Sequence, residues 1–333
     1  MINQNSPEYE KETVILAQID LTTGSIPKTL LRFAFPMICG NLLQQLYNVA
    51  DTLIVGRFLG SDALGAVGSS YTLMTFLTSI LLGLCMGSGA LFSVCWGQRD
   101  LARLRRQTHA AFVLIAVCTV VLNAAAFLLL DAMKTLLSVP AEVWPLMRSY
   151  LFVIFFGIGG TFLYNYYASL LRAVGNSLVP LLFLAAAAVL NISLDLVFVL
   201  VCRWGVEGAA AATVLAQWLS GIGTAVYTLV RCPELRARRE ERRITGSMLR
   251  ELLSASVLTC LQQSVMNLGI LMVQGRINSF GPVIMAAFAA AVKIDSFAYM
   301  PLQDFGNAFS TFIAQNYGAQ QPERIRRGIR TAV

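Results

Sequence analysis

Six long stretches without Asp, Glu, Lys or Arg constrain the fold of this chain more than any other feature. They cover residues 63–98, 107–130, 149–171, 173–194, 208–230 and 252–275. A helix crosses the hydrocarbon core of a bilayer with about 20 apolar residues, and each stretch is long enough to do so. Charged residues make up only 13% of the chain, whereas about 25% is usual for soluble domains. The sequence therefore predicts an all-α polytopic membrane protein.

One further apolar segment, residues 36–60, carries a row of polar side chains. Asn41, Gln44, Asn48 and Asp51 follow one another at spacings of three, four and three residues, so a helix places them on one face. A carboxylate in such a helix is costly in hydrocarbon and is tolerated against a protein partner or a water-filled cavity. This polar face is therefore a candidate functional surface.

The basic residues predict the orientation and the division of the chain. With the N-terminus inside, cytoplasmic segments receive 19 Lys and Arg residues and the outer loops receive five, which fits the positive-inside rule. We expect a multi-pass cell-membrane protein with a cytoplasmic tail (1–28), six transmembrane helices (29–231), a basic cytoplasmic loop (232–251) and a further segment (252–333). The net charge of +7 gathers in these loops, so we expect the lipid bilayer as a partner and no nucleic acid.

An internal repeat predicts the architecture. The segment LQQLYNVADTLIVGR at 43–57 recurs as LQQSVMNLGILMVQGR at 261–276. Six predicted helices separate the two copies, and because six is an even number the copies have the same orientation. The pattern is typical of transporters built from two parallel repeats. We therefore expect two six-helix lobes, the first complete and the second cut off after about two helices and the beginning of a ninth, and we expect the sequence to be a fragment.

The residues suited to metal binding or nucleophilic catalysis are few. The seven cysteines form no Cys-x-x-Cys pair, and His109, which we expect at the edge of a loop, is the only histidine. A histidine-based metal site or a Ser-His-Asp triad therefore has little material. A membrane-embedded enzyme is the disfavoured alternative, and we expect neither enzymatic activity nor a cofactor.

Several motifs resemble those of the multidrug and toxic compound extrusion (MATE) transporters. They are PMICGNLLQQLYNVADT with VGRFLG (36–60), NISLD (191–195), GAAAAT (208–213) and AQNYGA (314–319). The resemblance implies two six-helix lobes around a central cavity and export of organic cations and other amphipathic small molecules in exchange for H⁺ or Na⁺. We expect the protein to act as a monomer. A lipid or lipid-linked oligosaccharide flippase of the same fold is the alternative function.

The resemblance also implies a coupling site for H⁺ or Na⁺ in the first lobe. Its residues by motif position are Asp51, Asn191, Asp195 and Thr213. Apart from a Na⁺ at these residues we expect no metal. Another branch of the family carries a glutamate on the seventh helix, where this chain has Gln262-Gln263. Further candidates for the cavity or the substrate are Asn41, Gln44, Asn48, Asn165, Gln263, Asn267, Lys293 and Asp295.

Structural interpretations stay open for several of these residues. Asp195 could pair with a neighbouring helix, and the amides could serve helix-to-helix hydrogen bonding. The Tyr164–Tyr167 cluster is typical of packing more than of drug binding, and the roles of Lys293, Asp295 and Asp304 are open. Pro36 and Gly40 offer bend points in the first helix. We expect that ion occupancy at the acids bends or repacks this helix.

Overall fold

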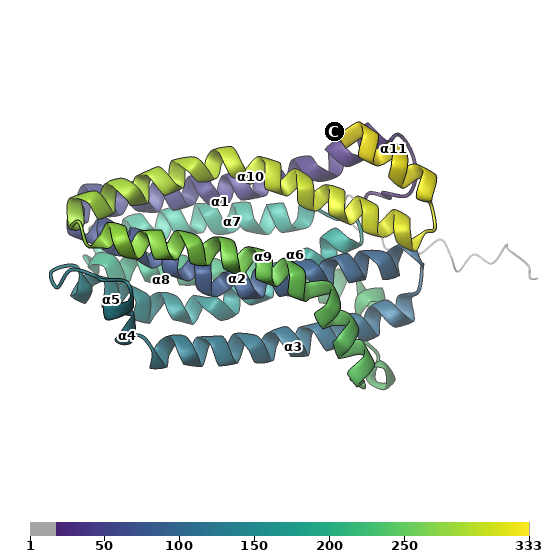
Figure 1. Ribbon diagram of the computed structural model, residues 1–333, viewed down its shortest axis with the longest axis horizontal. Helices are drawn as coiled ribbons and strands as arrows, with labels where there is room; N and C mark the ends of the chain where they lie inside the picture. Colours follow the sequence, from purple (N-terminus) through teal and green to yellow (C-terminus); the bar gives the residue numbers. More distant parts are fainter. Residues whose placement is uncertain (1–17, 333) are drawn as a thin grey trace, which may run out of the picture.

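The computed structural model describes residues 18–332, apart from the side chains of residues 293 and 296, and its regular elements there are all helical. The long helices run side by side along the longest axis of the molecule (Figure 1). In chain order the elements are α1 (Ile26–Leu59), α2 (Ser61–Gly97), α3 (Leu101–Leu128), α4 (Ala132–Leu136), α5 (Trp144–Ile154), η1 (Phe155–Gly157), α6 (Ile158–Ala173), α7 (Leu178–Asp195), η2 (Leu196–Val201), α8 (Gly205–Arg231), η3 (Pro233–Leu235), η4 (Arg239–Arg242), α9 (Gly246–Asn278), α10 (Pro282–Gly318) and α11 (Pro322–Ala332).

Six helical spans in the described residues are long and apolar enough to cross a membrane. They are Ser61–Gly97, Leu101–Leu128, Trp144–Ala173, Leu178–Val201, Gly205–Arg231 and Gly246–Asn278. A bent pair within α10, Pro282–Val292 and Phe297–Gly318, is a seventh when taken as one span. Helix α1 is not among them, because its polar face lowers its mean hydropathy. The all-α membrane fold expected from the charge-free stretches is confirmed.

The described end of the N-terminal segment is packed against the bundle. Ile19 donates its backbone N–H to the Gly175 carbonyl at 2.9 Å, and Leu21 is fully buried beside Phe33 and Phe312. Residues 1–17 of the expected tail lie outside the described residues. Helix α1 then begins at Ile26, three residues before the predicted limit, after Ser25 and with Pro27 in its first turn.

Two basic segments expected to be loops are partly helical, which corrects their predicted limits. The basic run of residues 97–107 predicts a loop, but α3 begins at Leu101, because the Asp100 carboxylate caps it by accepting the Arg103 N–H at 2.9 Å. His109 consequently lies inside α3 and not at a loop edge. The expected loop 232–251 contains two short 3₁₀ turns, and α9 begins within it at Gly246.

Helices α9 and α10 lie against α2 along its whole length. A Cβ atom at Gly87 of α2 would stand 2.4 Å from the Ser256 Cα of α9, and one at Gly97 would stand 2.0 Å from the Gln315 carbonyl oxygen of α10. Such distances are closer than any real Cβ contact, so the backbones meet directly at these glycines. Small residues on α2 therefore fix how a second set of helices, α9 and α10, docks on the first set, α1 to α8.

The two ends of the bundle differ in charge. The arginine-rich end carries the segments 97–106, 231–250 and 322–332 together with Arg172. The opposite end carries α4 and the turns at 202–204 and 279–281. Figure 1 places α11, the start of α9 and the turn between α2 and α3 at one end and α4 at the other. The basic segments of the described chain thus lie together at one end of the bundle.

Candidate cation-coupling site

The four residues that the resemblance implies for ion coupling lie on three neighbouring helices. Helix α7 packs between α1 and α8, so Asp51, Asn191 with Asp195, and Thr213 come from helices that touch. The Asn191 amide donates to the Thr213 hydroxyl at 3.3 Å, and the charges of Asp51 and Asp195 act on one another. The fold therefore brings all four into one group in the interior of the bundle formed by α1 to α8.

Asp195 is the most unusual member of this group. Its side chain has no accessible surface, and neither of its carboxylate oxygens has a hydrogen-bond partner among the described residues. The Asn191 side-chain oxygen is in the same state. The structural interpretation, in which Asp195 pairs with a neighbouring helix, has no partner to support it here. Buried oxygens without donors are a set of ligands suited to a proton or a small cation.

A change in helix geometry begins directly after Asp195. Residues Leu196–Val201 form a π-helical turn, and the Cys202 N–H donates to the Val197 carbonyl at 2.9 Å, five residues back. Single π-helical turns inside α-helices occur frequently at functional sites. The wider turn ends the regular hydrogen-bonding of α7 at the carboxylate. The sequence offers no signal for this turn.

Two tyrosines that sequence reasoning missed complete the surroundings of the acids. Tyr150 of α5 is 5% exposed and interacts electrostatically with Asp51 and Asp195. Tyr47, one turn before Asp51 in α1, also interacts with both Asp51 and Tyr150. Nothing in the local sequence marks Tyr150, because only the packing of α5 beside the other helices brings it here.

A second acidic site joins α1 to α10. Asp304 is 2% exposed and accepts a hydrogen bond from the Asn41 amide. Arg172 and Tyr164 of α6 interact electrostatically with it. Asn41 therefore binds to α10, unlike Asp51 of the same helix face, which belongs to the group with Asp195. The sequence places Asp304 in an apolar run but not opposite Asn41.

The other amides that the sequence predicts for the cavity, on α1, α6 and α9, hydrogen-bond chiefly within their own helices. Asn48 donates to Gln45 at 2.9 Å, Asn165 to the Thr161 carbonyl at 2.8 Å, and Asn267 to the Gln263 carbonyl at 2.8 Å. Gln44 interacts with the Tyr47 hydroxyl. Gln263 and Asn267 are buried.

Two of the charged residues predicted for the cavity lie in the middle of α10. Asp295 is exposed in the described structure. The prediction for Lys293 falls outside the described residues, because its side chain is not among them. Their expected role in the cavity stays a prediction.

A buried amide network that sequence reasoning also missed connects α2 to α9 near the end of the bundle that carries α4. Gln274 donates to the Asn278 side-chain oxygen at 2.7 Å and to the Ser69 hydroxyl at 3.1 Å. Thr72 donates to Gln274 at 3.2 Å, and Asn278 donates to the Leu137 carbonyl at 2.9 Å. The spacing of Gln274 and Asn278, four residues on one face of α9, is the signal that could have found this network.

Known proteins with similar sequences and folds are transporters. Residues 36–197 and 255–333 match the MatE family. The probable multidrug resistance protein YpnP of Bacillus subtilis is 31% identical over 312 residues, which cover 92% of this chain and 68% of YpnP. The probable multidrug resistance protein YoeA of the same organism is 27% identical over 93% of this chain and 68% of YoeA.

The fold agrees with these sequence relationships. A solved MOP superfamily transporter from Pyrococcus furiosus superposes on this protein with a TM-score of 0.84 at 23% identity. The superposition covers 95% of this chain and 70% of the transporter chain. At this identity the similarity is one of fold. The MATE resemblance carried by the motifs of α1, α7, α8 and α10 is confirmed. The chain belongs to the MatE family, the MATE efflux transporters.

Proposed function

We propose that this protein is an antiporter that exports amphipathic organic cations in exchange for H⁺ or Na⁺ bound at the Asp51–Asp195 group. The observation that carries the proposal is Asp195, whose two buried carboxylate oxygens have no hydrogen-bond partner among the described residues. An unpaired intramembrane carboxylate is costly to keep. Reversible binding of a coupling ion to Asp195 explains why the chain keeps this carboxylate despite its cost.

The mechanism follows from the helices that hold the group. A cation between Asp51 and Asp195 offsets the repulsion of the two carboxylates and draws α1 toward α7. When the cation leaves, the carboxylates repel one another. Helix α1 also contacts α10 through Asn41 and Asp304, so a shift of α1 changes the surface between the two sets of helices. Alternating access of that surface to the two sides of the membrane couples the ion to the substrate.

The experiment is transport by the full-length protein in proteoliposomes, with ethidium as substrate and an imposed gradient of pH or of Na⁺. We expect one gradient to drive ethidium export and Asp195→Asn and Asp51→Asn each to abolish it. The matched control is Asp131→Asn, because Asp131 is exposed and pairs with Arg148 at the opposite end. It undergoes the same chemical change and should export ethidium at the wild-type rate.

Two results would contradict the proposal. Full ethidium export by both buried-acid variants would show that coupling lies elsewhere. Absence of ethidium export by folded wild-type protein under either gradient would favour the flippase. The orientation is tested separately: we propose that the arginine-rich end faces the cytoplasm, and a cysteine-reactive impermeant reagent should label an introduced cysteine at Arg239 only from the inner side.

A further inference from the structure

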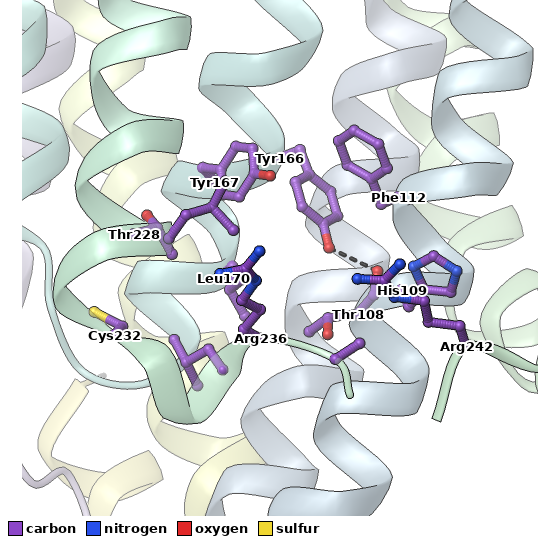
Figure 2. Close-up of a pocket in the computed structure, with 13 residues that line it drawn as sticks. Thr108, His109, Phe112, Tyr166, Tyr167, Leu170, Thr228, Cys232, Arg236 and Arg242 are labelled. Carbon is purple, nitrogen blue, oxygen red and sulfur yellow. Dashed lines mark hydrogen bonds between the residues drawn. The ribbon is translucent and has the colours of Figure 1, made fainter. Parts of the chain in front are cut away.

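A cavity at the arginine-rich end is separate from the coupling site. It has a volume of about 290 Å³ and lies between α3, α6, α8 and the segment that follows α8 (Figure 2). No described residue of α1, α9 or α10 lines it. The cavity therefore belongs to the first set of helices, α1 to α8, and is not part of the surface between the two sets.

The interior of this cavity is apolar. Its walls include Phe112, Tyr167 and Leu170. The Tyr166 hydroxyl already donates to the Thr108 carbonyl at 2.6 Å, as Figure 2 shows, and the Thr228 hydroxyl donates to the Thr224 carbonyl at 2.7 Å. These hydroxyl hydrogens are therefore engaged within the protein. The interior suits a hydrocarbon group.

The rim of the cavity is cationic. Arg236 and Arg242 line it, and both also line a neighbouring hollow of about 530 Å³ together with Arg105 and Arg238. Arg105 is neutralised by Glu241 at 2.8 Å. Among the described residues neither Arg236 nor Arg242 has a carboxylate within ion-pairing distance. Glu234 is the carboxylate in the neighbouring hollow, so positive charge remains in excess where the two hollows meet.

The position of the cavity favours a membrane lipid as its occupant. Leu229 lines the cavity and is 43% exposed, and Val226 and Val230 beside it on α8 are 52% and 68% exposed. This face of a membrane-spanning helix is suited to contact hydrocarbon. The apolar interior is thus next to the lipid-facing side of α8, and the two arginines stand at the level where the basic segments begin.

We propose that this cavity binds an anionic phospholipid, with its phosphate between Arg236 and Arg242 and part of an acyl chain against Phe112, Tyr167 and Leu170. Guanidinium groups bind phosphate with two parallel hydrogen bonds, and basic pockets between membrane helices on the cytoplasmic side hold such head groups. Occupancy would tie the segment after α8 to the membrane surface and join α3 to α8.

The test uses the purified full-length protein in neutral detergent. Its thermal unfolding midpoint is measured against added phosphatidylglycerol, phosphatidylcholine or inorganic phosphate, because a ligand of the folded state raises the midpoint. We expect a rise of several degrees with phosphatidylglycerol and none with the other two. Arg236→Gln with Arg242→Gln should lose most of the rise. The matched control, Arg239→Gln with Arg243→Gln, removes the same charge from the same segment outside the cavity and should keep it.

A second variant and a second measurement guard against a general effect of charge. Ala237→Trp fills the mouth shared by the two hollows and should also abolish the rise. A photoreactive phosphatidylglycerol should label peptides from 108–112, 166–170 or 228–242. An equal rise with phosphatidylcholine, or equal losses in the two arginine pairs, would overturn the proposal. An equal rise with inorganic phosphate would show a free-anion site instead, and labelling confined to α9 or α10 would place the lipid elsewhere.

Discussion

At the scale of single residues, the buried acids differ in how the fold treats them. Asp304 accepts a hydrogen bond from Asn41, whereas both oxygens of the fully buried Asp195 have no donor among the described residues. Stability alone would favour an uncharged residue at position 195, because burying a charge without partners is costly. Asp304 thus joins two helices, whereas for Asp195 we propose a functional role.

This difference predicts opposite effects on activity and stability at Asp195. Asp195→Asn keeps the shape of the side chain and removes its charge, so we expect the thermal unfolding midpoint in detergent to stay or rise while gradient-driven export is lost. The comparison is Asn278→Ala, which removes one acceptor of the buried Gln274 amide and the donor to the Leu137 carbonyl and should cost about 1–3 kcal/mol of stability. A large loss of stability in Asp195→Asn would indicate a structural role.

At the scale of elements, close helix contacts and paired arginines decide how the segments dock. Helix α2 meets α9 at Gly83 and Gly87, where an added Cβ would stand 2.4 Å from a backbone atom. The segment after α8 is held to α3 by the ion pair between Arg105 and Glu241. The first contact requires glycine on α2, and the second requires a carboxylate at position 241 opposite Arg105.

The α2–α9 contact predicts that a single methyl group is harmful. Gly87→Ala must push apart the backbones of α2 and α9, so we expect a loss of about 1–3 kcal/mol or more and lower yield of folded protein. Gly40→Ala is the matched control, because its Cβ would meet Leu181 at an ordinary 3.6 Å. Size-exclusion profiles and unfolding midpoints of the two variants measure the effect. Equal behaviour would contradict the contact.

The ion pair of the segment after α8 predicts a pH-dependent attachment. Two hydrogen bonds from the Arg105 guanidinium lower the pKa of Glu241 from 4.5 to about 2. A lowered pKa means that the stabilisation is complete above about pH 4.5 and is lost as the pH falls toward 2. Glu241→Gln should therefore loosen the segment at neutral pH, and hydrogen exchange in residues 232–245 should be roughly fivefold faster, for about 1 kcal/mol.

The matched control for this prediction is Glu240→Gln, because Glu240 is exposed and forms no ion pair within the described part of the chain. Its exchange should match that of the wild type at pH 7. For the wild type itself, exchange corrected for its intrinsic pH dependence should quicken below about pH 4.5 and not above it. Equal protection in Glu241→Gln and the wild type would show that the ion pair does not hold the segment.

At the scale of the whole molecule, α9 and α10 contact the first set of helices at both ends. Near the end that carries α4, the Ser69 hydroxyl of α2 donates a hydrogen bond to the Asn278 side-chain oxygen of α9 at 3.0 Å. At the arginine-rich end the Gln315 amide donates to the Ala173 carbonyl at 2.7 Å, and Arg324 donates to three carbonyls of residues 21–24. An exporter that opens alternately to the two sides of the membrane must break the contacts at one end and then those at the other.

This arrangement predicts that a covalent link across α2 and α9 stops export. The pair Ser69→Cys with Asn278→Cys should form a disulfide under oxidation and abolish ethidium export in the full-length protein, and dithiothreitol should restore it. Each single variant is the control and should export under both conditions. Export by the fully cross-linked protein would contradict movement at this contact.

The sequence determined the fold class, because long charge-free stretches admit few structures other than membrane helices. It also determined the family, through motifs centred on Asp51, Asn191 to Asp195 and Thr213. The helix starts at basic segments were harder to predict. A capping carboxylate such as Asp100 extends a helix into a charged region, and charge counting does not register that contact.

Only the tertiary structure decided which polar residues meet. It placed Tyr150 beside the two acids and Asn41 against Asp304, although the residues of these pairs are 45, 99 and 263 positions apart in the sequence. The π-helical turn after Asp195 appeared only in the structure, and the cavity behind Arg236 is formed by segments that are distant in the sequence. A local pattern fixes the face of a helix on which a residue lies, but the partner of that face depends on how the helices dock.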